Sequence, residues 1–133
     1  MILLDTTVLV YAVGGEHPLA APARQLVADM SGGRLKAHTT PEVIQEFAHV
    51  RARRRSREDA EALATAFANA CAPLQVITGQ HLEAGLRLWR AQVSLSSFDA
   101  VLAALAISLD AELISADRAF ASVPQLRWRD LAA

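Results

Sequence analysis

Short apolar runs and longer amphipathic segments succeed one another along the chain. A short apolar run bounded by polar or turn residues is typical of a buried strand. Such runs occupy residues 2–5, 34–40, 74–78, 112–116 and, as a strand or a tail, 126–131. The segments between them carry apolar residues three or four positions apart, which predicts helices. These helices are expected at residues 6–13, 17–33, 40–55, 56–72, 79–93 and 96–111.

Polar residues mark where several of these helices begin. Thr40 followed by Pro41 has the pattern of an N-cap with proline in the first helical position. Ser56, with Asp59 three residues later, marks the next helix start in the same way. Strands that alternate with helices form parallel sheets covered by helices on both faces. We therefore expect an α/β fold of three layers, α/β/α, around a central parallel sheet of four to five strands.

Length and composition place these elements in a single domain spanning residues 1–133. The chain has 53% apolar but only 5% aromatic residues, so its core must consist mainly of Ala, Leu, Val and Ile. Cys71 is the only cysteine, which excludes an intrachain disulfide and suits a reducing compartment. No apolar run is long enough to cross a membrane, and the first residues do not resemble a targeting segment. We expect a cytoplasmic protein with no membrane contact.

Two acidic residues interrupt apolar runs at the ends of predicted strands. Asp5 follows "MILL", and Asp117 follows "LISA". A lone buried carboxylate costs desolvation free energy unless a partner compensates it. The carboxyl ends of parallel strands lie at one edge of an α/β sheet, where functional sites form. Asp5 and Asp117 are therefore expected to share one edge of the sheet.

Two further acids lie on predicted helices. Glu46 stands at the margin of the apolar stripe formed by Val43, Phe47 and Val50. Asp99 lies in the first turn of the last predicted helix, which brings it to the end of that helix where it meets the sheet edge. This helix is expected to bury an apolar face formed by Phe98, Val101, Leu102, Leu105 and Leu109.

Each acid also has a purely structural interpretation. Asp5 and Asp117 could each cap the turn that follows. Asp99 could complete a capping box with Ser96, and Glu46 could be a surface residue. Taken together, however, several carboxylates at one rim repel one another, and a hard divalent cation relieves that repulsion. Oxygen ligands alone favour Mg²⁺ or Mn²⁺, and such an ion activates water for phosphodiester hydrolysis.

Four ordered segments carry a resemblance to a known family. "LLDTTVLV", "PEVIQEF", "SSFDAVLAALA" and "LISADRAF" resemble the PIN domain, and more narrowly the VapC-type toxins of bacterial type II toxin–antitoxin pairs. The resemblance covers essentially the whole chain. It implies a PIN-like fold and a metal-dependent endoribonuclease, with Mg²⁺ or Mn²⁺ as cofactor and RNA as substrate. It also implies a homodimer, and inhibition by a VapB-type antitoxin whose C-terminal segment lies in the active-site groove.

The resemblance also implies which residues form the site. The acidic site would consist of Asp5, Glu46, Asp99 and Asp117. The three aspartates would bind the metal ion, and the glutamate would orient or deprotonate the attacking water. Thr6 and Ser115 match hydroxyl positions that support the site in this family. Many relatives carry another acid two residues after the last aspartate, whereas this chain has Ala119, which leaves the number of metal ions open.

Arginines are concentrated just after the segment that carries Glu46. Five of the 13 basic residues lie in "RARRRSR". Four of them could bind RNA phosphate or the antitoxin, or could complement the dipole of a helix C-terminus: Arg51, Arg53, Arg54 and Arg55. Two tryptophans add further surface candidates. Trp89 is expected in the core or at a dimer interface, and Trp128 could stack a base or pack as an edge-strand aromatic.

The alternative to a nuclease is a PIN fold that has lost catalysis and only binds RNA or protein. Two other enzyme classes fit less well. A phosphotransferase of the haloacid dehalogenase kind would need a second aspartate where this chain has Thr7. A receiver domain would need a lysine near its end, but the only lysine here is Lys36. The presence of all four acids favours the nuclease.

Overall fold

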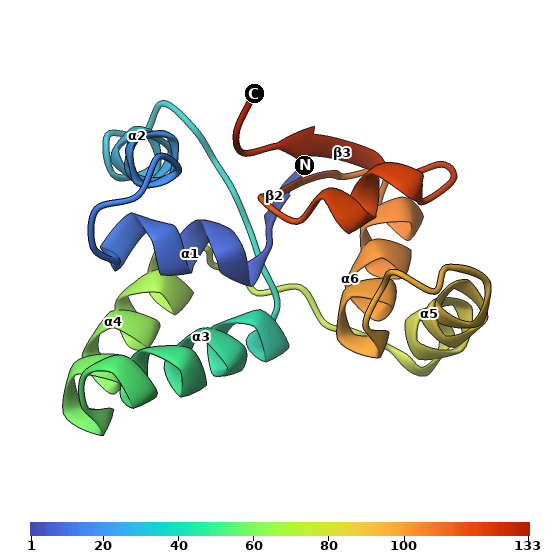
Figure 1. The fold of residues 1–133 in the computed structure, drawn as a ribbon, viewed down its shortest axis with the longest axis horizontal. Coiled ribbons are helices and arrows are strands. Elements are labelled where there is room, and N and C mark those ends of the chain that lie inside the picture. Colours follow the sequence, from blue (N-terminus) through green and yellow to red (C-terminus); the bar gives the residue numbers. More distant parts are fainter.

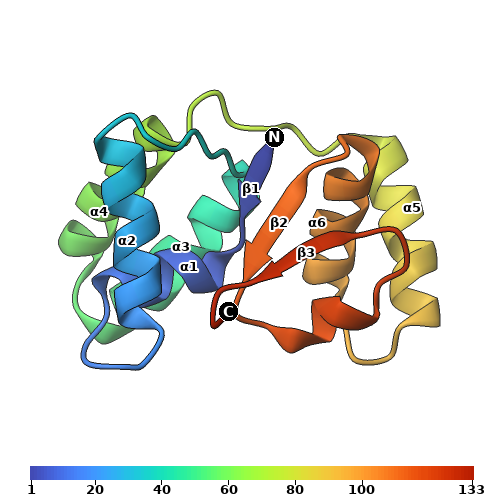
Figure 2. The same cartoon turned by 90° about the horizontal axis from the view of Figure 1, so that it is seen from above.

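The computed structural model describes all 133 residues of the chain (Figure 1). Its strands are β1 (Ile2–Leu4), β2 (Glu112–Ser115) and β3 (Arg127–Asp130). They form one parallel sheet in the order β1-β2-β3, and Figure 2 shows their C-terminal ends at the lower edge of the sheet. The central strand is therefore β2, which pairs with β3 just after it in the sequence and with β1 at the distant start of the chain.

Six α-helices cover the sheet. Four lie on one side of it in Figure 2: α1 (Thr6–Val13), α2 (Ala20–Ser31), α3 (Pro41–Arg54) and α4 (Arg57–Ala70). Two lie on the other side: α5 (Gly79–Ala91) and α6 (Ser97–Ser108). A short 3-10 helix, η1 (Arg118–Ser122), connects β2 to β3. The predicted three-layer α/β/α arrangement is thus confirmed, and no helix is both long and apolar enough to span a membrane.

The sheet has three strands, so the prediction of four to five strands was wrong. Residues 34–40 contribute only an isolated parallel bridge to β1, at His38. The amide of His38 donates to the carbonyl of Ile2, and its carbonyl accepts from the amide of Leu4, both at 2.9 Å. Thr40 then caps α3. Pairing stops after one bridge because the chain turns into the helix.

The segment at residues 74–78 also forms no strand. The amide of Gln75 donates a hydrogen bond of 2.8 Å to the carbonyl of Thr39, which itself belongs to the unpaired connection before α3. A segment that lies beside an irregular neighbour has no regular row of partners for its own backbone groups. The last predicted strand, by contrast, is present as β3, which pairs with β2 in parallel.

Side-chain caps fix the helix starts that frame the site. The hydroxyl of Thr40 accepts a hydrogen bond from the amide of Val43 at 3.1 Å, as the Thr-Pro pattern predicted. Ser56 and Ser96 cap α4 and α6 in the same manner, each through the amide three residues later. These caps satisfy amides at the helix ends that have no partner within the helix.

The helices α5 and α6 approach each other closely at a glycine. A Cβ atom at Gly85 would lie 2.6 Å from the Cα of Val101 and 2.7 Å from its Cγ2. Only a residue without a side chain fits this contact, although glycine lowers helix stability by about 1 kcal/mol relative to alanine. The contact sets the position of α5, and α5 forms one wall of the site described below.

The burial of α6 differs from the expected single apolar face. Its residues from Ala100 to Ala106 are all buried, so the helix is covered on every side over this stretch. Phe98 was expected to belong to the buried face but is 78% exposed, and Leu109 is 37% exposed. Phe98 therefore lies on the side of the first turn that faces away from the core, whereas Ala100 in the same turn is buried. Trp89 on α5 is 48% exposed, which excludes the core position proposed for it.

Candidate active site

Asp5 lies at the C-terminal end of β1 with its carboxylate buried. The residue is only 4% exposed and precedes α1, but its side chain makes no capping hydrogen bond to that helix. Its Oδ2 accepts hydrogen bonds from the hydroxyls of Ser115 at 2.6 Å and Thr7 at 3.1 Å. Both hydroxyls bind the same oxygen, and Oδ1 receives no side-chain hydrogen bond. The hydroxyls therefore hold Oδ2 in place, and the nearby amides of Thr6 and Thr7 add to the groups that favour the ionised carboxylate.

Two hydroxyl side chains connect β1 to the end of β2. Ser115 also accepts a hydrogen bond from the amide of Asp117 at 3.0 Å, and Thr7 accepts one from the amide of Ala116 at 3.0 Å. Because each hydroxyl carries one hydrogen, both hydrogens are used on Asp5. Ser115 stands where the sequence placed a supporting hydroxyl, whereas Thr7 was missed. Its signal was the "DTT" pattern, since a hydroxyl two residues after an aspartate can bond locally to it.

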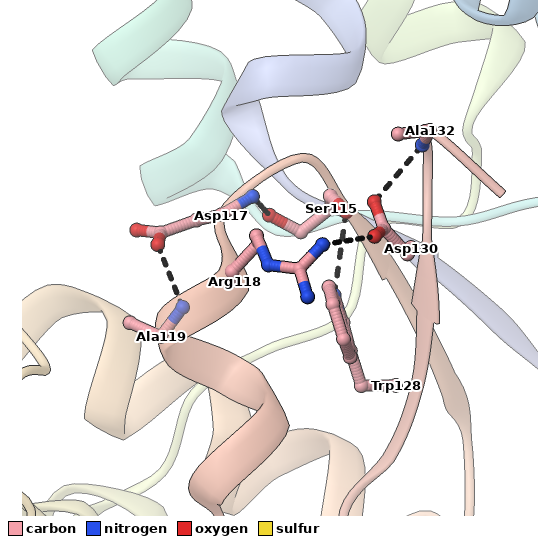
Figure 3. Close-up of polar contacts among 7 residues, drawn as sticks. All are labelled: Ser115, Asp117, Arg118, Ala119, Trp128, Asp130 and Ala132. Atoms are coloured by element: carbon pink, nitrogen blue, oxygen red, sulfur yellow. Dashed lines mark hydrogen bonds and ion pairs between the residues drawn. The ribbon is translucent and has the colours of Figure 1, made fainter.

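Asp117 follows β2 and caps η1. Its Oδ1 accepts a hydrogen bond from the amide of Ala119 at 2.9 Å (Figure 3). The capping interpretation is thus confirmed for this acid. In the same view the indole Nε1 of Trp128 donates to the carbonyl of Ser115 at 3.3 Å. This hydrogen bond fixes the indole at the sheet edge and supports the edge-strand interpretation of that aromatic residue.

Glu46 lies on the exposed side of α3 and is linked to the start of α1. The hydroxyl of Thr6, which is buried, donates to Glu46 Oε2 at 3.0 Å. Thr6 is the immediate neighbour of Asp5 in the sequence. The hydrogen bond therefore holds one oxygen of the exposed glutamate against the end of β1, on the side of the molecule where Asp5 lies.

Asp99 lies in the first turn of α6, and its amide donates to the hydroxyl of Ser96 at 3.1 Å. Burial raises the pKa of Asp99 from 3.8 to about 7. The negative charges of three other acids contribute to this increase: Asp5, Asp117 and Glu46. Burial also raises the pKa of Asp5, against the opposing effect of the hydrogen bond from Ser115. The structure thus brings the four predicted acids close enough to repel one another.

A cavity of about 790 Å³ opens beside three of these acids, Asp5, Glu46 and Asp99. Its two walls differ in character. The wall on α3 carries polar side chains, among them Gln45 and His49. The opposite wall, formed by the segment before α5 and by α5 and α6, is mostly apolar and includes Ile77, Leu82, Leu86 and Phe98. A polymer with a charged side and an apolar side would match such a cavity.

The four acids have the oxygen atoms that a hard divalent cation prefers, but their side chains are not arranged around a common point. All four acids offer carboxylate oxygens, which Mg²⁺ and Mn²⁺ prefer. No group of three or more His, Cys, Asp or Glu side chains is arranged to hold a metal ion. The repulsion acting on Asp99 nevertheless means that a bound cation would stabilise the ionised acids. Cys71 cannot take part, because it is buried and burial raises the pKa of its thiol to about 11.

The four predicted arginines divide into two groups. Arg51 is engaged within the protein: its Nε pairs with Asp59 on α4, and its guanidinium donates to the carbonyl of Val13 at 3.1 Å. It joins the end of α3 to α4 and α1, which is a structural role. The other three, Arg53, Arg54 and Arg55, are exposed at the end of α3.

Comparison with known proteins identifies the family and the fold. Residues 2–126 match the family model of the PIN domain. Ribonuclease VapC7 of Mycobacterium tuberculosis is 52% identical over 128 residues, which cover 92% of this chain and 86% of that protein. Two solved structures share the fold. VapBC-1 from nontypeable Haemophilus influenzae matches with a TM-score of 0.75 and 16% identity, and both chains are fully covered. VapBC2 from Rickettsia felis, bound to a promoter DNA fragment, matches with a TM-score of 0.72 and 17% identity, and 98% of each chain is covered. The chain therefore belongs to the PIN domain family and, within it, to the VapC group.

Proposed function

We propose that this chain is a Mg²⁺-dependent endoribonuclease and the toxin of a VapBC-type toxin–antitoxin pair. The observation that carries the proposal is the repulsion among four carboxylates, which helps to raise the pKa of Asp99 to about 7. None of the four takes part in an ion pair within the chain. An uncompensated acidic cluster is unfavourable for folding but suits a divalent cation. The 52% identity to a protein named as a ribonuclease supports the same activity here.

The four acids would divide two roles in hydrolysis between them. Asp5, Asp99 and Asp117 would hold the cation, for which Mn²⁺ is an acceptable substitute. When bound, such an ion lowers the pKa of a water molecule and neutralises charge on the phosphoryl oxygens. Glu46, held by Thr6, would accept a proton from the attacking water.

The supporting residues would keep this arrangement ready for the substrate. The hydroxyls of Ser115 and Thr7 hold Oδ2 of Asp5 in place. The amide of Ala119 orients Asp117. Because position 119 carries no carboxylate, the residues present support one metal ion, and a second ion would need ligands from the substrate.

The proposed partners are RNA, an antitoxin of the VapB type and a second copy of the chain. The structural neighbours are VapBC complexes, which supports the antitoxin. Exposed apolar side chains at the end of α5 and just after it support the homodimer, since such patches mark protein interfaces. They are Trp89, near the end of α5, and Val93, which follows the helix.

The test of this function is RNA cleavage by the purified protein with Mg²⁺ or EDTA. We expect cleavage with Mg²⁺ that leaves 5′-phosphate and 3′-hydroxyl ends, and at least a thousandfold loss in Asp99→Asn, in line with the large share of such reactions attributed to electrostatic stabilisation. Asp110→Asn is the matched control, because its carboxylate is 88% exposed and lies outside the cluster. Cleavage in EDTA, or full activity of Asp99→Asn, would contradict the proposal. Binding without cleavage would support the catalytically inactive module instead.

A further inference from the structure

The cavity beside the acids has an acidic wall on α3 and an apolar wall on α5 and α6. Its lining includes Asp5, Glu42, Glu46 and Asp99 but no lysine or arginine. Phosphate groups away from a bound cation would therefore be repelled within the cavity itself. They need positive or hydrogen-bonding side chains at its margin. The opposite wall is apolar and offers contacts to uncharged groups only.

The margin that meets this need is one face of α3. His49 lines the cavity one turn beyond Glu46, and Arg53 lies one turn beyond His49. At about 100° per residue, Arg53 returns to within roughly 20° of Glu46, about 10 Å further along the helix axis. Both His49 and Arg53 are exposed. Arg54 is rotated about 100° away from Arg53 and does not face the cavity.

Phe98 is the exposed aromatic residue of the apolar wall. Phe98 is 78% exposed although the residues from Ala100 to Ala106 on the same helix are buried, and it lines the cavity immediately beside Asp99. An exposed aromatic ring next to a nucleic-acid site can stack on a base, and every base offers a flat face for such a contact. In a duplex those faces are covered by neighbouring bases, so only an unpaired base can use the ring.

We propose that single-stranded RNA binds in this cavity with its sugar–phosphate backbone along α3 and an unpaired base stacked on Phe98. His49 and Arg53 contact phosphates on the α3 side. This inference rests on the proposed function, and it adds the path of the RNA backbone along α3 and three residues with stated contacts. None of the three is a metal ligand or a proton acceptor in the proposed hydrolysis.

Binding can be measured apart from cleavage in the Asp99→Asn background, which leaves RNA intact. The assay is fluorescence anisotropy of a labelled 12-nucleotide single-stranded RNA and of the same strand in a duplex. We expect Phe98→Ala to weaken single-strand binding about tenfold, to leave duplex binding unchanged, and Phe98→Tyr to retain affinity. Val76→Ala is the control, because Val76 is 71% exposed and does not line the cavity.

The α3 contacts are tested by the salt dependence of the same affinity. Arg53→Gln should lower the slope of log affinity against log salt by about 0.7, the value for one phosphate contact on a single strand, and Arg54→Gln should not. His49→Ala should weaken binding, and His49→Gln, which keeps a hydrogen-bond donor, should restore most of it.

Several results would overturn this inference. They are an unchanged single-strand affinity in Phe98→Ala, an equal loss on the duplex, or equal slope changes in Arg53→Gln and Arg54→Gln. A change in the monomer–dimer equilibrium of Phe98→Ala without a change in RNA affinity would assign the ring to a protein interface and would also reject it. Cleavage by the wild-type chain with normal RNA binding by Phe98→Ala rejects this inference alone. Binding as described without cleavage by the wild-type chain rejects only the proposed function.

Discussion

Replacing Asp99 with asparagine is expected to stabilise the metal-free protein while it abolishes RNA cleavage. The pKa of Asp99 rises from 3.8 to about 7 in the folded state, a difference of roughly 3 units. At about 1.4 kcal/mol per unit this corresponds to about 4 kcal/mol against folding when the group is ionised. Asp99 is partly exposed, and solvent screening lowers the figure to about 2 kcal/mol.

The sign of the effect fixes its pH dependence. The unfolded chain releases the proton of Asp99 near pH 3.8, whereas the folded protein keeps it up to about pH 7. The free energy of unfolding of the metal-free wild type should therefore fall as pH rises between these values and level off above them. Asp99→Asn lacks this group, so its gain over the wild type should be about 2 kcal/mol at pH 8 and about half of that at pH 5.

Urea unfolding in EDTA, followed by circular dichroism at pH 5 and pH 8, measures this difference. Glu83→Gln serves as a matched control, since Glu83 is exposed and pairs only with Arg87 one turn away. Its loss should cost about 0.3 kcal/mol at both pH values. Added Mg²⁺ should stabilise the wild type and leave Asp99→Asn unchanged, because binding to the folded state raises its stability.

An Asp99→Asn variant that is no more stable than the wild type at pH 8 in EDTA would contradict this prediction. An increase in the free energy of unfolding that is equal at pH 5 and pH 8 would contradict it as well. Either result would show that repulsion among the acids does not act on Asp99, and the case for a cation site would lose its main support.

Three further predictions follow from the same contacts. Gly85→Ala should lower the free energy of unfolding by about 1 kcal/mol, because overpacking against Val101 outweighs the gain in helix propensity; a more stable variant in urea unfolding would contradict the close contact. Ser115→Ala should weaken Mg²⁺ affinity measured by calorimetry, because Asp5 loses a hydrogen bond of 2.6 Å that favours its ionised form; unchanged affinity would remove Ser115 from the site. Trp89→Glu should shift the protein toward monomer in analytical ultracentrifugation, whereas Arg90→Glu beside it should not; an unchanged dimer would place the interface elsewhere.

Local signals in the sequence were sufficient for most helices. The caps at Thr40 and Ser56 depend on a side chain and an amide three residues away, so the sequence contains everything that determines them. The acids at strand ends were also visible, because a carboxylate within an apolar run requires a compensating partner. The pKa of Asp99 now shows that the charges of these acids act on one another.

The features that the sequence did not reveal depend on long-range contacts. Strand-like composition occurs in residues 34–40 and 74–78, but strand formation depends on the neighbouring strand. The first segment forms one bridge to β1, and the second donates one backbone hydrogen bond, from Gln75 to Thr39. Phe98 fits the apolar period of α6 and is nevertheless exposed, because it lines the open cavity beside Asp99 and not the core. The role of Thr7 required knowledge that β2 lies beside β1, since its hydroxyl joins Asp5 to the segment after β2.

In the proposed site Asp5, Asp99 and Asp117 would hold one divalent cation, and a crystal soaked in Mn²⁺ tests this directly. We expect an anomalous difference peak coordinated by carboxylate oxygens of these three residues, and no such peak in crystals of Asp99→Asn. A wild-type crystal that shows no peak among these residues, from a preparation that cleaves RNA with Mn²⁺, would contradict it.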